Sequence, residues 1–65
     1  MERDWKDRLK YEYMELTTRM DRLECSIYST TEDFDRTQLG LMQVQLRIMD
    51  SYRVVLEERL RVAGI

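Results

Sequence analysis

The chain has 65 residues, a formal net charge of −2 and 37% charged residues of both signs. A domain this short buries little apolar surface and often needs disulfides, a metal or oligomerisation for its stability. Cys25 is the single cysteine, which excludes an intrachain disulfide, and the lack of histidine and of a Cys-x-x-Cys pair argues against zinc. Oligomerisation is therefore the favoured source of additional stability.

The composition also limits the partners. No apolar run approaches the roughly 20 residues needed to span a bilayer, and the first ten residues, MERDWKDRLK, are too charged for a signal peptide. Long nucleic acid favours a strongly basic surface, whereas a small anionic ligand needs only a few cations held in one place. A lone thiol fits a reducing cytosol. We expect a cytoplasmic protein that binds neither a membrane nor long nucleic acid.

The first predicted element is a helix over residues 4–28. Asp4 is placed to cap its first turn. Its apolar residues recur at steps of three and four, which is the helical period: Trp5, Leu9, Tyr13, Leu16, Met20, Leu23 and Ile27. Residues 29–35, STTEDFD, collect hydroxyl and acidic side chains that favour a turn, and Asp35 with Gln38 resembles a second helix cap.

A second helix is predicted over residues 36–62, with Gly40 weakening it by roughly 1 kcal/mol and Gly64 as its stop. Its stripe consists of Leu39, Met42, Leu46, Met49, Tyr52, Leu56 and Leu60. Two helices of similar length with a short connection predict an all-α, antiparallel two-helix hairpin, either straight or with a kinked N-terminal segment, that forms one domain over residues 1–65.

Each helix also carries a second apolar series. The second helix has Leu41, Val44, Ile48, Val55 and Val62, and the first has a weaker series of Tyr11, Met14, Cys25 and Tyr28. A two-helix monomer has nothing to cover these residues with. We therefore expect copies of the chain to cover them, which gives a helical homo-oligomer.

Trp5 and Arg19 are the main candidates for ligand binding. Periodicity alone favours Trp5 as a core or hairpin-end residue, and the alternative is an accessible surface on which a base stacks. Arg19 is either a solvated arginine that pairs with Glu15 or Asp21, or a residue that binds a phosphate. The planar guanidinium group suits the second role, because its N–H donors match the oxygens of a phosphate. Fourteen residues of straight helix separate the two by roughly 21 Å. One small ligand could touch both only at a junction between chains or across a kinked N-terminal segment.

Other candidates are weaker. Lys6 and Arg8 lie beside Trp5 in a basic cluster that is also consistent with a mixed-charge surface. Cys25 lacks an activating base and is expected to be buried. Four tyrosines are also expected to be buried, with their hydroxyl groups hydrogen-bonded: Tyr11, Tyr13, Tyr28 and Tyr52. The chain has no histidine and no glycine-rich phosphate loop, so we expect neither an enzyme nor a cofactor. Arg59 lies in the last turns of the second helix, where a cation is favoured.

The pattern W-K-x-R-L-x-x-E-Y-x-x-L-x-x-R-M-x-x-L at residues 5–23, followed by Q-L-x-x-M-x-x-Y-x-x-x-L-x-x-R-L at residues 45–60, resembles the anti-CBASS sponges of bacteriophages. These small proteins sequester the cyclic oligonucleotide messengers of a bacterial immune system. The resemblance covers most of the chain. It implies a helical hexamer of interlocked dimers, with cyclic dinucleotides bound between paired protomers.

The resemblance also implies roles for individual residues. The family's base-stacking aromatic, usually tyrosine, falls on Trp5, and the phosphate-binding lysine of the family falls on Arg19, which precedes Met20 and Leu23. Arg59 matches an arginine that holds cyclic trinucleotides at a separate site in some members. The predicted function is therefore a non-enzymatic sponge for these messengers in the host cytoplasm. The alternative is a helical module that inhibits a host protein through a methionine-rich face.

Overall fold

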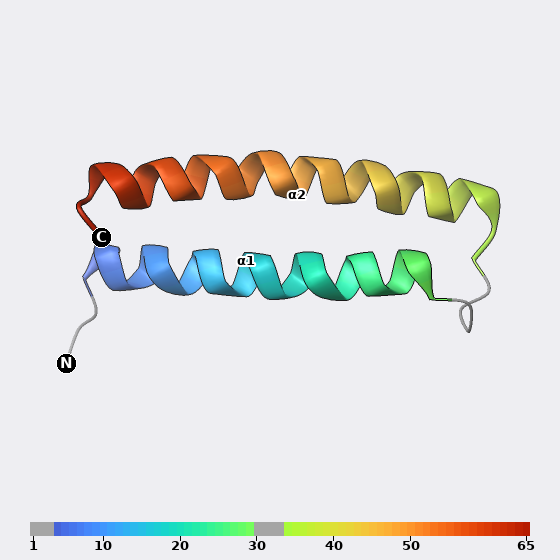
Figure 1. Ribbon diagram of the computed structural model, residues 1–65, viewed down its shortest axis with the longest axis horizontal. Helices are drawn as coiled ribbons and strands as arrows, with labels where there is room; N and C mark the ends of the chain where they lie inside the picture. Colours follow the sequence, from blue (N-terminus) through green and yellow to red (C-terminus); the bar gives the residue numbers. More distant parts are fainter. Residues whose placement is uncertain (1–3, 30–33) are drawn as a thin grey trace.

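The computed structural model describes residues 4–29 and 34–65. Within them, helix α1, Trp5–Tyr28, and helix α2, Arg36–Val62, lie side by side and run in opposite directions (Figure 1). The prediction of an all-α, antiparallel two-helix hairpin is confirmed. Because α1 is continuous from Trp5 and shows no sharp bend (Figure 1), the straight form of the hairpin holds rather than the kinked one.

Each helix is preceded by the aspartate that the sequence predicts as its N-cap. The Asp4 carboxylate accepts a hydrogen bond from the Asp7 backbone N–H at 3.0 Å, and the Asp35 carboxylate accepts one from Gln38 at 2.7 Å. Each bond satisfies a backbone donor that has no partner inside its helix. At the other end of α2, Gly64 adopts a φ of 77°, a left-handed conformation that glycine reaches without a steric penalty.

The core is small and lies between the two predicted apolar stripes. Leu9, Leu16 and Leu56 are its buried side chains among the described residues. Tyr13, Met20, Met49 and Leu60 pack against them. All of these residues belong to the stripes that the helical period predicts.

Tyr52 departs from the predicted stripe, because its side chain is exposed. At 100° per residue Arg53 lies nearer the middle of the interface than Tyr52 does. The half-buried Arg53 guanidinium pairs with Asp50 at 2.7 Å and with Glu57 at 2.8 Å. Glu57 in turn accepts a hydrogen bond from the Tyr13 hydroxyl at 3.2 Å, so a polar network joins the two helices beside the core.

The second apolar series is on the outside of the hairpin. All of its members are exposed, and its largest exposed fractions on α2 are 65% for Ile48 and 73% for Val62. The expectation that Cys25 and the tyrosines are buried is wrong for four of these residues, whose side chains are exposed: Cys25, Tyr11, Tyr28 and Tyr52. The physical reason is that each helix has one neighbour only, so a second apolar face has no protein surface against it.

Candidate functional site

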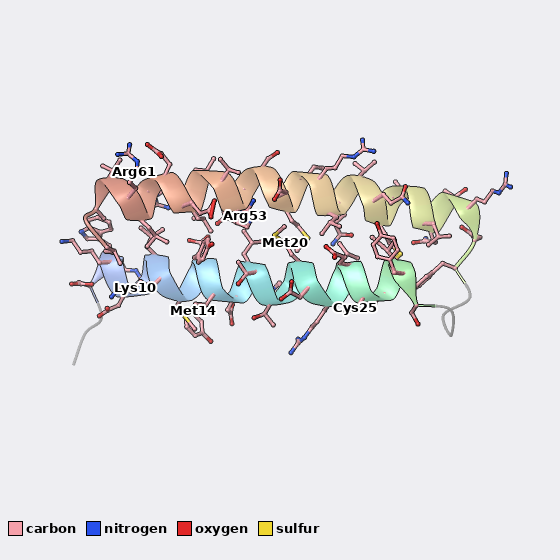
Figure 2. The ribbon with its side chains drawn as sticks, viewed as in Figure 1. Lys10, Met14, Met20, Cys25, Arg53 and Arg61 are labelled. Carbon is pink, nitrogen blue, oxygen red and sulfur yellow. The ribbon has the colours of Figure 1, made fainter. Side chains whose placement is uncertain are left out.

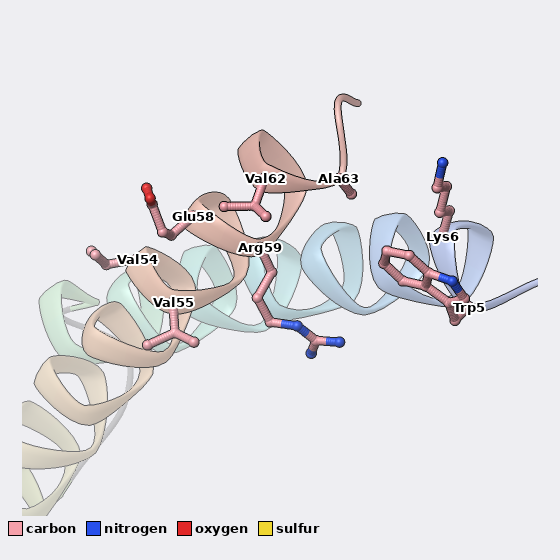
Figure 3. Close-up of a pocket in the computed structure, with 8 residues that line it drawn as sticks. All are labelled: Trp5, Lys6, Val54, Val55, Glu58, Arg59, Val62 and Ala63. Carbon is pink, nitrogen blue, oxygen red and sulfur yellow. The ribbon is translucent and has the colours of Figure 1, made fainter.

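A groove with a volume of about 830 Å³ lies at the end of the hairpin where α1 begins and α2 ends. The helices bring residues from the two ends of the chain to this groove, since they are antiparallel (Figure 3). Its lining consists of Trp5 and Lys6 from α1, and of Val54, Val55, Glu58, Arg59, Val62 and Ala63 from α2 or the residue after it.

Trp5 is an accessible aromatic surface at one side of the groove. Its side chain is 50% exposed, although it belongs to the apolar stripe of α1, so Trp5 is a residue of the hairpin end and not of the core. Trp5 is the first residue of α1, and it lies opposite the last residues of α2, where little protein remains to cover it. The Lys6 ammonium lies 5.8 Å from the centroid of the Trp5 ring, which is within the range of a cation–π interaction.

Arg59 supplies a cation to the same groove. Figure 3 shows its guanidinium extending from α2 toward the end of the groove where Trp5 lies. Within residues 4–29 and 34–65, no carboxylate forms an ion pair with Arg59. An arginine without a carboxylate partner keeps its planar set of donors available for an anion such as phosphate.

The acid in the groove lining has its own partner. Glu58 pairs with Arg61, and the hydrogen bond from Arg61 lowers the pKa of Glu58 below its usual value. The carboxylate charge of Glu58 is thus offset by a guanidinium on the outer side of α2, where Figure 2 places Arg61. The two cations that face the groove, Lys6 and Arg59, are not engaged by Glu58.

The remaining lining is apolar. Val54, Val55, Val62 and Ala63 form a surface beside Trp5. Cations at the edge of an apolar surface and an aromatic ring suit a ligand with a planar base and a phosphate. A volume of about 830 Å³ is within the usual range of small-molecule sites.

The other predicted site residues lie elsewhere. Arg19 pairs with Glu15 at 3.3 Å, as one of the two alternatives predicts, and lines a separate groove of about 290 Å³. Arg8 is exposed on α1 and does not line the groove of Trp5. Of the five predicted ligand-binding residues, the structure therefore brings together Trp5, Lys6 and Arg59.

The valines of the groove were not predicted as site residues. The sequence does indicate that Arg59 lacks an acidic partner on its own helix. Arg61 has Glu58 three residues before it, whereas Arg59 has Val55 at i−4 and Val62 at i+3. Helical ion pairs form at these spacings. An arginine flanked by valines in this way is left without a partner on its own helix.

Residues 4–29 and 34–65 contain no group of three or more histidine, cysteine, aspartate or glutamate side chains that could hold a metal ion. In the same ranges neither helix combines the length and the apolar character that crossing a bilayer requires.

The fold and the groove define a class of protein, a small all-α hairpin with a surface groove of ligand size between its two chain ends. The family model named Sequestin matches residues 3–62, and the chain belongs to the Sequestin family. No curated protein and no solved structure matches the chain.

Proposed function

We propose that this protein sequesters cyclic oligonucleotide messengers without cleaving them, as a bacteriophage protein that evades CBASS-type immunity in the host cytoplasm. Cyclic dinucleotides are the proposed main ligands and cyclic trinucleotides are a second class. The observation that carries the proposal is the presence in one groove of Trp5, an exposed aromatic ring, and Arg59, a cation that pairs with no carboxylate of residues 4–29 and 34–65. The family name Sequestin and the resemblance to anti-CBASS sponges support it.

Each part of the groove has a role in this proposal. A base stacks on the Trp5 ring, which contributes roughly 1 to 3 kcal/mol per base. Arg59 donates hydrogen bonds to a phosphate, and Lys6 adds a second positive charge beside the ring. The valines contact the apolar faces of the base and the sugar. Sequestration without chemistry needs no catalytic base, and tight binding suffices to lower the free concentration of the messenger.

The proposal also includes a homo-oligomer, with a hexamer expected. Trp5 and Arg19 lie in different grooves of one chain, about 21 Å apart along α1. Arg19 can therefore contact a ligand held on Trp5 only if it comes from another copy. Ligand binding by Arg19 is thus a property of the oligomer in this proposal.

A titration tests the sequestration proposal. Purified protein is titrated calorimetrically with a panel of cyclic di- and trinucleotides, and nanomolar binding, about −12 kcal/mol, is expected for at least one of them. The complex is then denatured by heat, and the released ligand is identified by mass spectrometry. Intact ligand is the expected result. Binding to none of the panel rejects the proposal, and a linear product identifies an enzyme instead.

We expect Arg59→Ala to weaken binding of the best ligand roughly 10- to 150-fold, because a hydrogen bond between charged groups contributes about 1.5 to 3 kcal/mol. Arg47→Ala is the matched control, since it removes the same charge from an exposed position of α2 that does not line the groove. Its affinity should stay within about twofold of the wild type. Equal losses in both variants would indicate a general effect of charge rather than a contact from Arg59.

Arg19→Ala tests the contribution from a second copy. We expect weaker dinucleotide binding while light scattering shows an unchanged oligomeric mass, because the exposed Arg19–Glu15 pair contributes little to stability. Unchanged affinity removes Arg19 from the site and leaves the groove of Trp5 and Arg59 as the ligand site by itself.

The alternative function, a module that binds a host protein through a methionine-rich face, receives no support from the described residues. Met20 and Met49 pack against the core, and Met42 is half-buried. Figure 2 shows Met20 between the helices and Met14 on the outer side of α1. Met1 lies outside the described residues. Met14 by itself does not make a methionine-rich face.

A further inference from the structure

Another groove, with a volume of about 740 Å³, lies between the two helices, toward the end of the hairpin away from Trp5. Its walls are formed by side chains of residues 20–28 on α1 and of residues 43–51 on α2. It shares no lining residue with the groove of Trp5. Half-buried apolar side chains line its inner part: Met20, Ile27 and Leu46. We call it the inter-helix groove, and Figure 2 shows Met20 between the helices.

The two walls of the inter-helix groove carry opposite charges that do not pair. Glu24 lies on the α1 wall and Arg47 lies on the α2 wall. Within residues 4–29 and 34–65, neither side chain forms an ion pair. Asp50 is another acidic residue of the lining, and it pairs with Arg53 at 2.7 Å. The Glu24 carboxylate and the Arg47 guanidinium are therefore both available to a ligand.

The order of residues along each helix explains why these two charges stay unpaired. Ion pairs on a helix form between residues three or four positions apart. Glu24 has no cation at these spacings, where the chain has Met20, Asp21, Ile27 and Tyr28. Arg47 has one acid at these spacings, Asp50, which is engaged by Arg53. A pair of this kind differs from the ordinary mixed-charge surface, in which neighbouring charges satisfy each other.

Tyr28 adds an accessible aromatic ring one turn after Glu24. Its side chain is 77% exposed, and it lines the inter-helix groove. An exposed aromatic ring is a surface on which any nucleobase can stack. Carboxylates bind the hydroxyl groups of ribose, and guanidinium groups bind phosphate. The groove thus offers one group for each part of a nucleotide, which are the base, the sugar and the phosphate.

We propose that the inter-helix groove binds a linear nucleoside 5′-monophosphate with free 2′- and 3′-hydroxyl groups. The base stacks on Tyr28, the Glu24 carboxylate accepts hydrogen bonds from both hydroxyl groups, and the Arg47 guanidinium donates hydrogen bonds to the phosphate. The two hydroxyl groups and the 5′-phosphate lie at opposite edges of the ribose, as Glu24 and Arg47 lie on opposite walls of the groove. This site is additional to the proposed function and does not depend on it.

The position of Glu24 separates this ligand from the cyclic messengers. In a cyclic oligonucleotide the 2′ or the 3′ oxygen of each ribose is esterified, so no sugar keeps two neighbouring hydroxyl groups for the carboxylate. The phosphate on that oxygen would also bring a negative charge beside Glu24, and like charges repel. The inter-helix groove is therefore not a site for the cyclic messengers.

A comparison of two nucleotides tests the contact with the sugar. In equilibrium dialysis, labelled adenosine 5′-monophosphate (AMP) should bind the wild type saturably. Its 2′-deoxy analogue should bind roughly 10- to 150-fold more weakly, because it lacks one hydroxyl group that bonds to a charged acceptor. Absence of saturable AMP binding, or equal affinities for the two nucleotides, would overturn the inference.

Glu24→Gln tests whether this difference comes from the carboxylate. The variant should bind AMP more weakly than the wild type and should lose most of the preference for AMP over its 2′-deoxy analogue. Asp21→Asn is the matched control, since it removes the same charge from an exposed position of α1 outside the groove, and it should keep the preference. A full preference in Glu24→Gln, in a chain that circular dichroism shows to be helical, would contradict the assigned contact.

Arg47→Ala tests the contact with the phosphate. It should weaken binding of AMP roughly 10- to 150-fold, since the lost hydrogen bonds join charged groups. Arg36→Ala is the matched control, because Arg36 is exposed on α2 and lines neither this groove nor that of Trp5. Equal losses of AMP binding in the two variants would indicate a general effect of charge and would reject the site.

Competition shows whether the two grooves act separately. The cyclic oligonucleotide that binds best in the calorimetric panel is added at saturation, and binding of AMP should not change, because the grooves share no lining residue. Displacement of AMP would place it in the groove of Trp5 and reject a separate site. If no cyclic oligonucleotide binds, the proposed function fails alone, and the comparison of AMP with its 2′-deoxy analogue still decides the present inference.

Discussion

Leu56→Ala is expected to destabilise the protein by about 2 to 5 kcal/mol, the usual cost of truncating a buried leucine. Leu56 has no exposed surface, and with Leu9 and Leu16 it makes up the buried core of the described residues. A small domain has roughly 3 to 5 kcal/mol of stability from its core, so this one change removes most of it. Urea unfolding followed by circular dichroism measures the effect.

Val54→Ala is the control for this experiment. It also truncates an aliphatic side chain on α2, two residues away, but the Val54 side chain is half-exposed. Its effect should be below about 1 kcal/mol, since little apolar area returns to water. Comparable losses in the two variants would contradict the assignment of Leu56 to the core. The measurement is made at one protein concentration, because the stability of an oligomer depends on it.

Trp5→Ala is expected to weaken binding of a cyclic dinucleotide by roughly 1 to 3 kcal/mol for each base that stacks on the ring, or about 5- to 150-fold. Trp5 is half-exposed at the edge of the groove, so its removal takes away contact area for the ligand while costing the fold little. Calorimetric titration measures the affinity. Trp5 is also the single tryptophan, so its fluorescence reports binding to the wild type directly.

Two further variants make the test of Trp5 specific. Trp5→Phe keeps an aromatic face and should retain most of the affinity. Tyr28→Ala removes an aromatic residue that is 77% exposed at the opposite end of α1 and should bind like the wild type. Equal affinity of Trp5→Ala and the wild type would remove the stacking surface from the site. Equal losses in Trp5→Ala and Tyr28→Ala would point to an effect on assembly instead.

Local patterns account for most of the fold. The period of the leucines predicts both helices and the three buried residues, because a helical face repeats every three or four residues whatever lies against it. Asp4 and Asp35 are recognisable as caps because a cap bonds to a backbone group only three residues away. The ion pair between Arg19 and Glu15 is predictable for the same reason.

The candidate site depends on features that local sequence patterns do not predict. Trp5 continues the apolar stripe of α1, and its period does not distinguish a core residue from one at the hairpin end; it is half-exposed because α2 ends beside it. Arg59 can be recognised from the residue order as an arginine without an acid at helical spacing. That it shares a groove with Trp5 depends on the antiparallel return of the chain.

The order of residues alone thus implies two capped helices, the face by which they pack and an excess of apolar surface, since each of these depends on neighbours within a few positions. The tertiary structure decided which residues meet at the open end of the hairpin. It joined Trp5 and Lys6 from the start of the chain to Arg59 near its end and kept Arg19 in a separate groove. The reason is geometric: a straight helix holds residues of one face apart, and only a second, antiparallel helix brings distant positions together.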